Sequence, residues 1–187
     1  MSEKYQLKRT GRNLIYGGSV FNFYEDTMEL PDGREEKWQY VEHRKGGGAC
    51  TVAILENGEI LMIRQYRPAI DAETLELPAG ARDKSSEDPA LTAARELKEE
   101  TGYSCTSVEK LVTLKTAVSW CNEETDVYLA LGVKKDGGQK LDPAEEIKVE
   151  SCPVEQVRDM IFSGQITDAK TVAGVLAYLA RCTGQGS

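Results

Sequence analysis

The stretch ELPAGARDKSSEDPALTAARELKEETGY, residues 76–103, decides the fold, and it places three glutamates within five positions. These are Glu96, Glu99 and Glu100. Like charges three or four residues apart on a helix repel each other by about 0.2–0.5 kcal/mol per pair. Residues 96 and 100 are one helical turn apart and share a face, with residue 99 beside them. A positive group is therefore expected among the three carboxylates.

Capping signals place the glutamates on a helix. Asp88 suits the N-cap position, Pro89 the first helical position, and Gly102 the C-terminal stop. Small and apolar residues mark the face that we expect to be buried, namely Ala90, Ala93, Ala94 and Leu97.

Carboxylate oxygens without a neighbouring His or Cys suit Mg²⁺ or Mn²⁺ better than zinc. The Pro-Ala-Gly turn before the helix can add a backbone carbonyl, and Arg95 can orient a carboxylate through a forked hydrogen bond. On spacing alone, a solvated acidic helix face remains the alternative to a metal site.

Length and composition bound the remaining possibilities. The chain of 187 residues fits one domain, and its 31 acidic against 23 basic residues give a net charge of −8. That charge argues against a general binder of nucleic acids or anionic membranes. The polar N-terminus lacks the apolar core of a signal peptide, and the five scattered cysteines suggest reduced thiols. We therefore expect a cytoplasmic enzyme with no nucleic-acid or membrane partner.

Turn signals organise the rest of the chain. Pro31-Asp32-Gly33 predicts a hairpin within residues 1–45, KGGG at 45–48 predicts a flexible joint, and Asn57-Gly58 predicts a second hairpin. The remaining elements that we expect are strands within 109–118, 124–133 and 147–152 and helices over 153–163 and 168–182. Such a mixture indicates an α+β fold or a mixed-sheet sandwich.

The whole stretch resembles the signature of the Nudix hydrolases. Gly80, Glu87 and RELKEETGY at 95–103 match it residue by residue, except that six residues instead of five separate Gly80 from Glu87. The resemblance implies an α/β/α sandwich with a mixed sheet over residues 46–187. It also implies an antiparallel β element over residues 1–45 that serves base binding and dimerisation.

The same resemblance implies roles within the signature. Glu96 and Glu100 would bind a metal directly, with the carbonyl of Ala79 as a third ligand. Glu99 would bind a further ion or its water, and Arg95 would hold the ligand carboxylates. The implied cofactor is Mg²⁺, with Mn²⁺ possible, and the implied reaction is hydrolysis of a nucleoside diphosphate linked to another group.

Segments outside the signature resemble ADP-ribose pyrophosphatases. In RQYRPAIDAETLELPAG, residues 64–80, Arg67 would contact the diphosphate, although an exposed strand-end arginine is the alternative. Trp38 would stack on adenine, with Phe21 as a weaker candidate. A tryptophan in the core or in a dimer interface is the alternative for Trp38. His43 receives no chemical role and is interpreted as a structural or surface residue.

Two acidic segments compete to supply the general base. The loop LDPAEEIKVE, residues 141–150, offers Glu145 and Glu146, which we prefer because the resembling subfamily places its base or an additional metal ligand there. Glu123, in the other segment, is the rival candidate for the base. We expect it instead to contact the sugar of the substrate.

The favoured function is Mg²⁺-dependent hydrolysis of ADP-ribose, or a similar ADP-sugar, to AMP and a sugar phosphate by a homodimer. A GDP-sugar or another dinucleotide is the close alternative. A sensor that binds ADP-ribose without cutting it is disfavoured, because every signature glutamate is present and no DNA-binding segment is appended.

Overall fold

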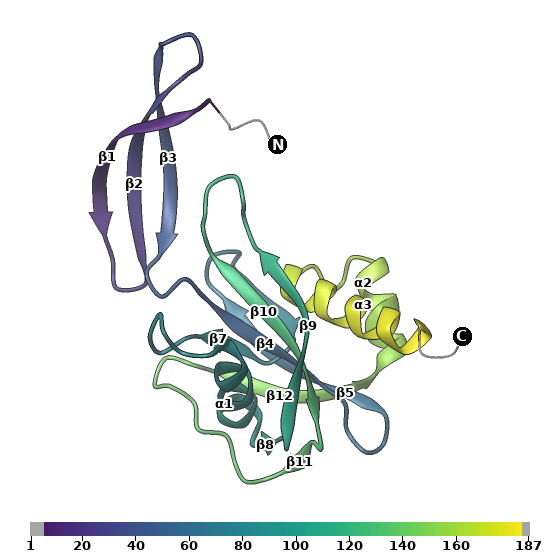
Figure 1. Ribbon diagram of the computed structural model, residues 1–187. Coiled ribbons are helices and arrows are strands. Elements are labelled where there is room, and N and C mark those ends of the chain that lie inside the picture. Colours follow the sequence, from purple (N-terminus) through teal and green to yellow (C-terminus); the bar gives the residue numbers. More distant parts are fainter. Residues whose placement is uncertain (1–5, 185–187) are drawn as a thin grey trace.

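The computed structural model describes residues 6–184, which form a mixed α+β fold. An antiparallel sheet at the N-terminus stands apart from a larger body in which strands lie between helices (Figure 1). The expected α+β sandwich with a preceding β element is confirmed. In this described part of the chain, no helix is long and apolar enough to cross a membrane.

The N-terminal sheet has three strands and not the two of the predicted hairpin. It comprises β1 (Lys8–Gly17), β2 (Phe21–Glu29) and β3 (Glu35–His43), in that order. The turn between β2 and β3 is the predicted one, and the Leu30 amide donates to the Arg34 carbonyl there at 2.8 Å. The sequence KRTGRNLIYG of β1 is mostly polar and shows no regular alternation, which is why it gave no strand signal.

Two sheets build the larger body. The first has the order β7-β4-β10-β9, and its β4 and β10 run parallel. The second has the order β12-β5-β6. Their bounds are Gly47–Ala53 for β4, Glu59–Arg67 for β5, Ala72–Glu76 for β6, Ala79–Ala81 for β7, Ser107–Lys115 for β9, Glu124–Leu131 for β10 and Ile147–Pro153 for β12. Two short strands, β8 (Tyr103–Ser104) and β11 (Lys134–Lys135), pair with each other.

The predicted hairpin at Asn57-Gly58 is wrong. The chain does reverse there, with Gly58 at a φ of 82°. However, β4 and β5 meet only in an isolated bridge between Ile54 and Ile60, and they then enter different sheets. A turn signal fixes the local reversal, whereas strand pairing depends on partners that are distant in the sequence.

The predicted flexible joint at 45–48 is also wrong, because Gly47 and Gly48 are buried in β4. A Cβ atom on Gly47 would overlap the backbone of Glu124, and one on Gly48 would overlap that of Gly80. The glycines therefore permit close approach of neighbouring strands.

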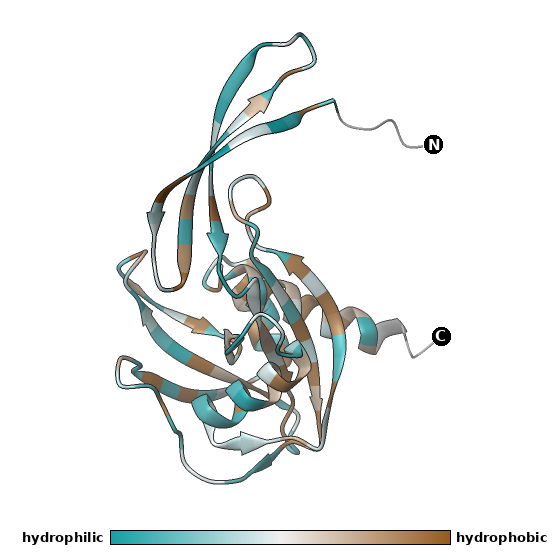
Figure 2. Ribbon diagram, turned by 60° about the vertical axis from the view of Figure 1, so that its left-hand side comes forward, coloured by the Kyte–Doolittle hydropathy of each residue, from teal (hydrophilic) through white to brown (hydrophobic). Residues whose placement is uncertain are grey.

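Helices cover both faces of the first sheet (Figure 1). On one face lies α1 (Pro89–Thr101), and on the other lie α2 (Val154–Phe162) and α3 (Ala169–Gly184). Successive residues of β4 point to opposite faces. Accordingly, Val52 packs in the cluster beneath α3, and Ala53 packs in the cluster that contains Leu97 of α1. Figure 2 shows hydrophobic and hydrophilic residues alternating along several strands.

The helix α1 begins and ends where its sequence predicts. The Asp88 carboxylate accepts a hydrogen bond of 2.9 Å from the Ala90 amide, and Gly102 adopts the left-handed conformation with a φ of 72°. Ala93 and Leu97 are fully buried, and Ala90 and Ala94 are half-buried. This helix carries the three signature glutamates into the body.

Candidate active site

Arg95 lies at the centre of the glutamates on α1. Its Nη1 donates to Glu96 at 2.7 Å and to Glu99 at 2.9 Å, and its Nη2 donates to the Ala81 carbonyl at 3.1 Å. Glu87 lies 3.6 Å from Nε despite the additional residue before it. Burial lowers the pKa of Arg95, but the surrounding carboxylates outweigh burial and raise it. The guanidinium is therefore always charged and orients two carboxylates.

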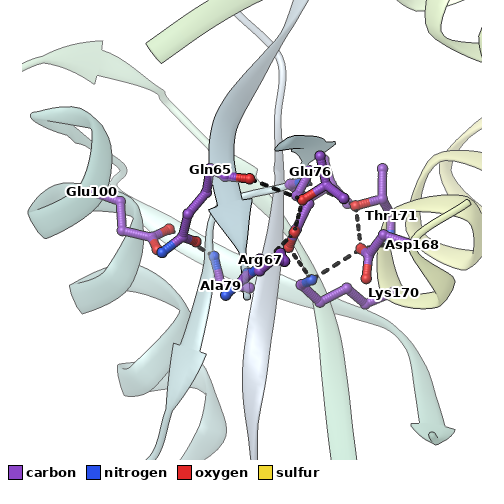
Figure 3. Close-up of polar contacts among 10 residues, drawn as sticks. Gln65, Arg67, Glu76, Ala79, Glu100, Asp168, Lys170 and Thr171 are labelled. Atoms are coloured by element: carbon purple, nitrogen blue, oxygen red, sulfur yellow. Dashed lines mark hydrogen bonds and ion pairs between the residues drawn. The ribbon is translucent and has the colours of Figure 1, made fainter. Parts of the chain in front are cut away.

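Glu100 is the most buried of the three glutamates, with 3% of its surface exposed. Its carboxylate accepts a hydrogen bond of 2.8 Å from the Ala79 amide (Figure 3). Burial, with the charges of Glu96 and Glu145, raises the pKa of Glu100 to about 8. Burial likewise raises the pKa of Glu96 to about 7, against the opposing effect of Arg95. For both carboxylates, the nearby hydrogen-bond donors and positive charges do not offset the cost of burying a negative charge.

An acidic cavity of about 350 Å³ opens beside these side chains. Its lining comprises Lys45, Gly80, Ala81, Asp83, Arg95, Glu96, Glu99, Lys140, Asp142 and Glu145. Glu145 comes from the loop before β12, where its carboxylate accepts from the Asp142 amide at 3.0 Å. The neighbouring Glu146 is exposed and does not line this cavity. No motif or spacing in the sequence indicated Lys45, Asp83, Lys140 and Asp142, because loops bring them together.

The donor atoms fit a hard divalent cation. Carboxylate oxygens are the ligands that Mg²⁺ and Mn²⁺ prefer, and a cation would favour the charged forms of Glu96 and Glu100. Over residues 6–184, no three acidic, His or Cys side chains are already gathered around one point. Arg95 engages Glu96 and Glu99, and the Ala79 amide engages Glu100. A cation would compete with these hydrogen bonds.

A second cavity, of about 390 Å³, shares Gly80 and Ala81 with the acidic one. Arg67, Glu123 and His43 are among its lining residues. Glu123 accepts a hydrogen bond of 2.7 Å from the Thr116 hydroxyl. His43 is only 4% exposed, so it is not a surface residue, and burial lowers its pKa despite the opposing charge of Glu123. A cavity that contains Arg67 thus adjoins the acidic one.

Arg67 belongs to a charge cluster around the buried Glu76 that no sequence pattern predicted. Its Nε and Nη2 donate to the two carboxylate oxygens of Glu76 at 2.7 and 2.6 Å (Figure 3). Lys170 also donates to Glu76 and lies 3.0 Å from the Asp168 carboxylate. Burial acts to raise the pKa of Glu76, but Arg67 and Lys170 lower it to about 2. The only sequence signal was an acidic residue between Leu75 and Leu77.

Trp38 lies away from both cavities. It is 48% exposed on β3 and lines a third cavity, of about 380 Å³, together with Tyr40 and Trp120. Phe21 packs edge-on against His43, with ring centroids 5.0 Å apart. Within one copy of the chain, the structure therefore brings Arg67 and Glu123 together and leaves Trp38 apart.

A family profile described as the NUDIX domain matches residues 45–174. This range includes α1 with its three glutamates, Arg67 and Lys170 of the second cavity, and Glu145 of the acidic cavity. The chain belongs to the Nudix family and is a Nudix hydrolase.

The curated relatives extend over nearly the whole chain. The ADP-ribose pyrophosphatase of Mycobacterium tuberculosis is 35% identical and covers 97% of this chain and 87% of its own length. That of Bacillus subtilis is 33% identical, with 92% and 91% covered. The methanol dehydrogenase activator of Bacillus methanolicus is 34% identical, with 94% of each chain covered. A solved ADP compounds hydrolase aligns with a TM-score of 0.84 over 99% of both chains, at 19% identity, and supports the fold.

Proposed function

We propose that this protein hydrolyses the diphosphate of ADP-ribose, or of a similar ADP-sugar, to AMP and a sugar phosphate in a Mg²⁺-dependent reaction. One observation carries the proposal: the acidic cavity beside α1 shares a wall with a cavity that presents Arg67. A diphosphate lying across that wall has cationic groups on one side and carboxylates able to bind Mg²⁺ on the other. The relatives with ADP-ribose pyrophosphatase activity in their names support the choice of substrate.

The signature residues would bind the metal. Glu96, Glu99, Glu100 and the Ala79 carbonyl are the proposed ligands, and the cofactor is Mg²⁺ or Mn²⁺. When bound, such ions neutralise the charge that develops on the phosphates and lower the pKa of water. Arg95 would act as a positioning residue, because it already holds two of the carboxylates.

A loop carboxylate would accept the proton of the attacking water. A general base must come within hydrogen-bond distance of that water. Of the two candidates before β12, Glu145 lines the acidic cavity, and the exposed Glu146 does not. We therefore favour Glu145 as the base. Water oxygen attacks one phosphorus, the bridging P–O bond breaks, and the electron pair leaves with the other phosphate.

The second cavity would bind the remainder of the substrate. Arg67 would contact the diphosphate, and Glu123 would accept hydrogen bonds from sugar hydroxyls. Both line the same cavity, which supports a shared ligand.

Trp38 would stack on adenine in the site of a second copy of the chain. It lies outside both cavities of its own chain, and a homodimer joined through residues 1–45 would supply it to the partner's residues 46–187. The N-terminal sheet exposes apolar side chains that suit such an interface, namely Leu14, Ile15, Tyr16, Val20 and Phe21.

A substrate panel tests the proposal. We would incubate the protein and Mg²⁺ with ADP-ribose, ADP-glucose, GDP-mannose, NADH and diadenosine polyphosphates and separate the products by chromatography. We expect the highest kcat/KM for ADP-ribose or another ADP-sugar, with AMP as product, and loss of most turnover in Glu100→Gln. The GDP-mannose pyrophosphatase of Shigella flexneri is 28% identical over 90% of this chain, so GDP-mannose is the decisive competitor. A preference for GDP-mannose would overturn the proposed substrate.

A further inference from the structure

Lys170 is a largely buried lysine at the first turn of α3. Its side chain is 18% exposed, and it lines the same cavity as Arg67. Lysine is almost never buried unless it is paired. Lys170 has two partners, Glu76 and Asp168. Burial lowers its pKa, but these two carboxylates outweigh burial and raise it. The ammonium group is therefore charged at the edge of the proposed substrate site.

Each of the two cations keeps a donor that the cluster does not use. An ammonium group has three N–H donors, and two of those on Lys170 are directed to Glu76 and Asp168. Arg67 uses Nε and Nη2 on Glu76. Among residues 6–184, neither the third ammonium donor nor Nη1 of Arg67 has a hydrogen-bonding partner. Both cations line the cavity, so an entering ligand can accept from both.

Stability alone does not explain this arrangement. A buried ion pair is often no more stabilising than apolar residues of similar volume. The strand β5 provides a comparison, because Arg64 makes the same two-pronged contact with Glu150 at 2.6 and 3.0 Å, and no second cation among the described residues is hydrogen-bonded to Glu150. Glu76 instead receives both Arg67 and Lys170. One buried carboxylate thus holds two cations, Arg67 and Lys170, at the wall of one cavity (Figure 3).

Asp168 pairs with Lys170 and also caps α3. Its carboxylate accepts from the Thr171 amide at 3.0 Å and from the Thr171 hydroxyl at 2.6 Å. Lys170 shares that carboxylate with the helix terminus. The ammonium group can therefore donate its third N–H to a further anionic partner while it keeps its contact with Glu76.

We propose that Lys170 is a second cationic contact for the substrate's diphosphate, beside Arg67, and that Glu76 is the positioning residue that holds both. The inference deepens the proposed function and rests on it. The unused donors of Arg67 and Lys170 suit the oxygens of a diphosphate, and the carboxylate of Glu76 between them sets their separation before the substrate arrives.

The test compares Lys170→Met with the matched variant Arg64→Met. Methionine removes the charge of Lys170 while keeping much of its volume, and Arg64 lies on the same strand as Arg67 outside the cavity. We would measure the Kd of inorganic pyrophosphate by calorimetry, with Mg²⁺ and separately with EDTA, and KM and kcat for ADP-ribose. We expect Lys170→Met to raise both Kd and KM about tenfold to a hundredfold, the loss of one charge-assisted hydrogen bond, with a smaller change in kcat. Arg64→Met should leave these constants unchanged.

The outcomes separate this inference from the proposed function. If the wild type cleaves ADP-ribose and Lys170→Met keeps the wild-type Kd and KM, the inference is overturned and the function stands. If no ADP-sugar is cleaved but Lys170→Met weakens pyrophosphate binding, the inference stands and the proposed substrate is wrong.

A wild-type measurement covers the case in which Lys170→Met does not fold. Acetylation of Lys170 by a water-soluble reagent would be followed by mass spectrometry with and without pyrophosphate. We expect pyrophosphate to slow acetylation of Lys170 and to leave Lys98 unaffected, since Lys98 pairs with Asp136 outside the cavity. Equal acetylation of Lys170 in both conditions would overturn the inference.

Discussion

The α-carbon of Gly80 lies against the carboxylate of Glu96, so a Cβ atom on residue 80 would come well inside 3.0 Å of that carboxylate. Gly80→Ala should therefore displace Glu96 from its place beside Arg95. Because the obstructing atoms are the end of a flexible side chain, we expect the fold to persist. The Mg²⁺ concentration for half-maximal activity should rise roughly tenfold to a hundredfold, as for other changes that misplace a ligand. A Mg²⁺ titration of activity measures this.

Gly138→Ala is the matched control for that substitution. Gly138 lies in the loop before β12 with nothing within 4 Å of a new Cβ atom, and its φ is not left-handed. Its Mg²⁺ dependence and Tm should equal those of the wild type. If Gly80→Ala also keeps the wild-type Mg²⁺ midpoint, contact between residue 80 and Glu96 is irrelevant to metal binding.

Mg²⁺ binding should release protons near neutral pH. In the metal-free protein the pKa of Glu96 is about 7 and that of Glu100 about 8, whereas the metal binds the deprotonated carboxylates. We expect proton release in weakly buffered solution at pH 7, measured with a pH-sensitive dye, and Mg²⁺ affinity that increases from pH 6 to pH 8. Glu100→Gln should release fewer protons. Mg²⁺ binding without proton uptake or release would contradict the metal assignment.

The same pKa values determine how stability depends on pH. Each folded-state pKa lies above the unfolded value of about 4.5, so the neutral carboxyls contribute stability that is fully present below pH 4.5. That contribution is lost as pH rises through 7 and 8. Taken alone, Glu96 and Glu100 should therefore lower the Tm of the metal-free protein between about pH 5 and pH 8, with little further change above that, and Mg²⁺ should reverse the decrease. Thermal scans with and without EDTA measure both effects.

Trp38→Ala tests the proposed contribution of one subunit to the other's site. Loss of a stack on adenine should raise KM for ADP-ribose about tenfold to a hundredfold with a smaller change in kcat, from the 1–3 kcal/mol of one stacking contact. Light scattering after size exclusion should show that the dimer persists. Phe162→Ala, at an exposed position on α2, is the control and should leave KM unchanged. A monomeric variant would instead assign Trp38 to the interface.

Local signals predicted the parts of the fold that depend on neighbouring residues. The limits of α1 follow from Asp88, Pro89 and Gly102, since capping and left-handed backbone need no distant partner. The Asn57-Gly58 turn also formed, but its strands joined different sheets, because β4 pairs with β10 and β5 with β12. Pairing of this kind is decided by the burial of whole strands and cannot be inferred from a dipeptide.

The candidate site likewise contains residues that local spacing predicted and residues that meet only in the folded chain. The three glutamates share one helix, so their spacing alone indicated a common face. The contact between Glu76 and Lys170 joins residues 94 positions apart, and no periodicity or motif links them. The contact forms only when the first turn of α3 lies beside the end of β6. Sequence reasoning therefore located the proposed metal ligands and missed the residues that hold Arg67.

The last prediction distinguishes the carboxylates of the two competing loops. A general base acts mainly in the transition state, so its removal lowers kcat and kcat/KM together, whereas loss of a sugar contact chiefly raises KM. Glu145 lines the acidic cavity and Glu123 lines the adjoining one. We expect Glu145→Gln to lower kcat by roughly 10²–10⁴, the range for a lost acid–base group, and Glu123→Gln to raise KM and alter the preference among sugars.

Glu146→Gln is the matched control, because Glu146 is adjacent in sequence but exposed and outside the acidic cavity. Its kcat should equal that of the wild type. A lower kcat in Glu145→Gln could also come from loss of a metal ligand, so a second measurement must separate the two causes. A base cannot be replaced by more metal, so kcat should stay low in raised Mn²⁺, and rescue by Mn²⁺ would instead make Glu145 a ligand. If Glu145→Gln and Glu146→Gln both keep full kcat while Glu123→Gln loses it, the base comes from the loop between β9 and β10, and the water attacks from the side of the second cavity.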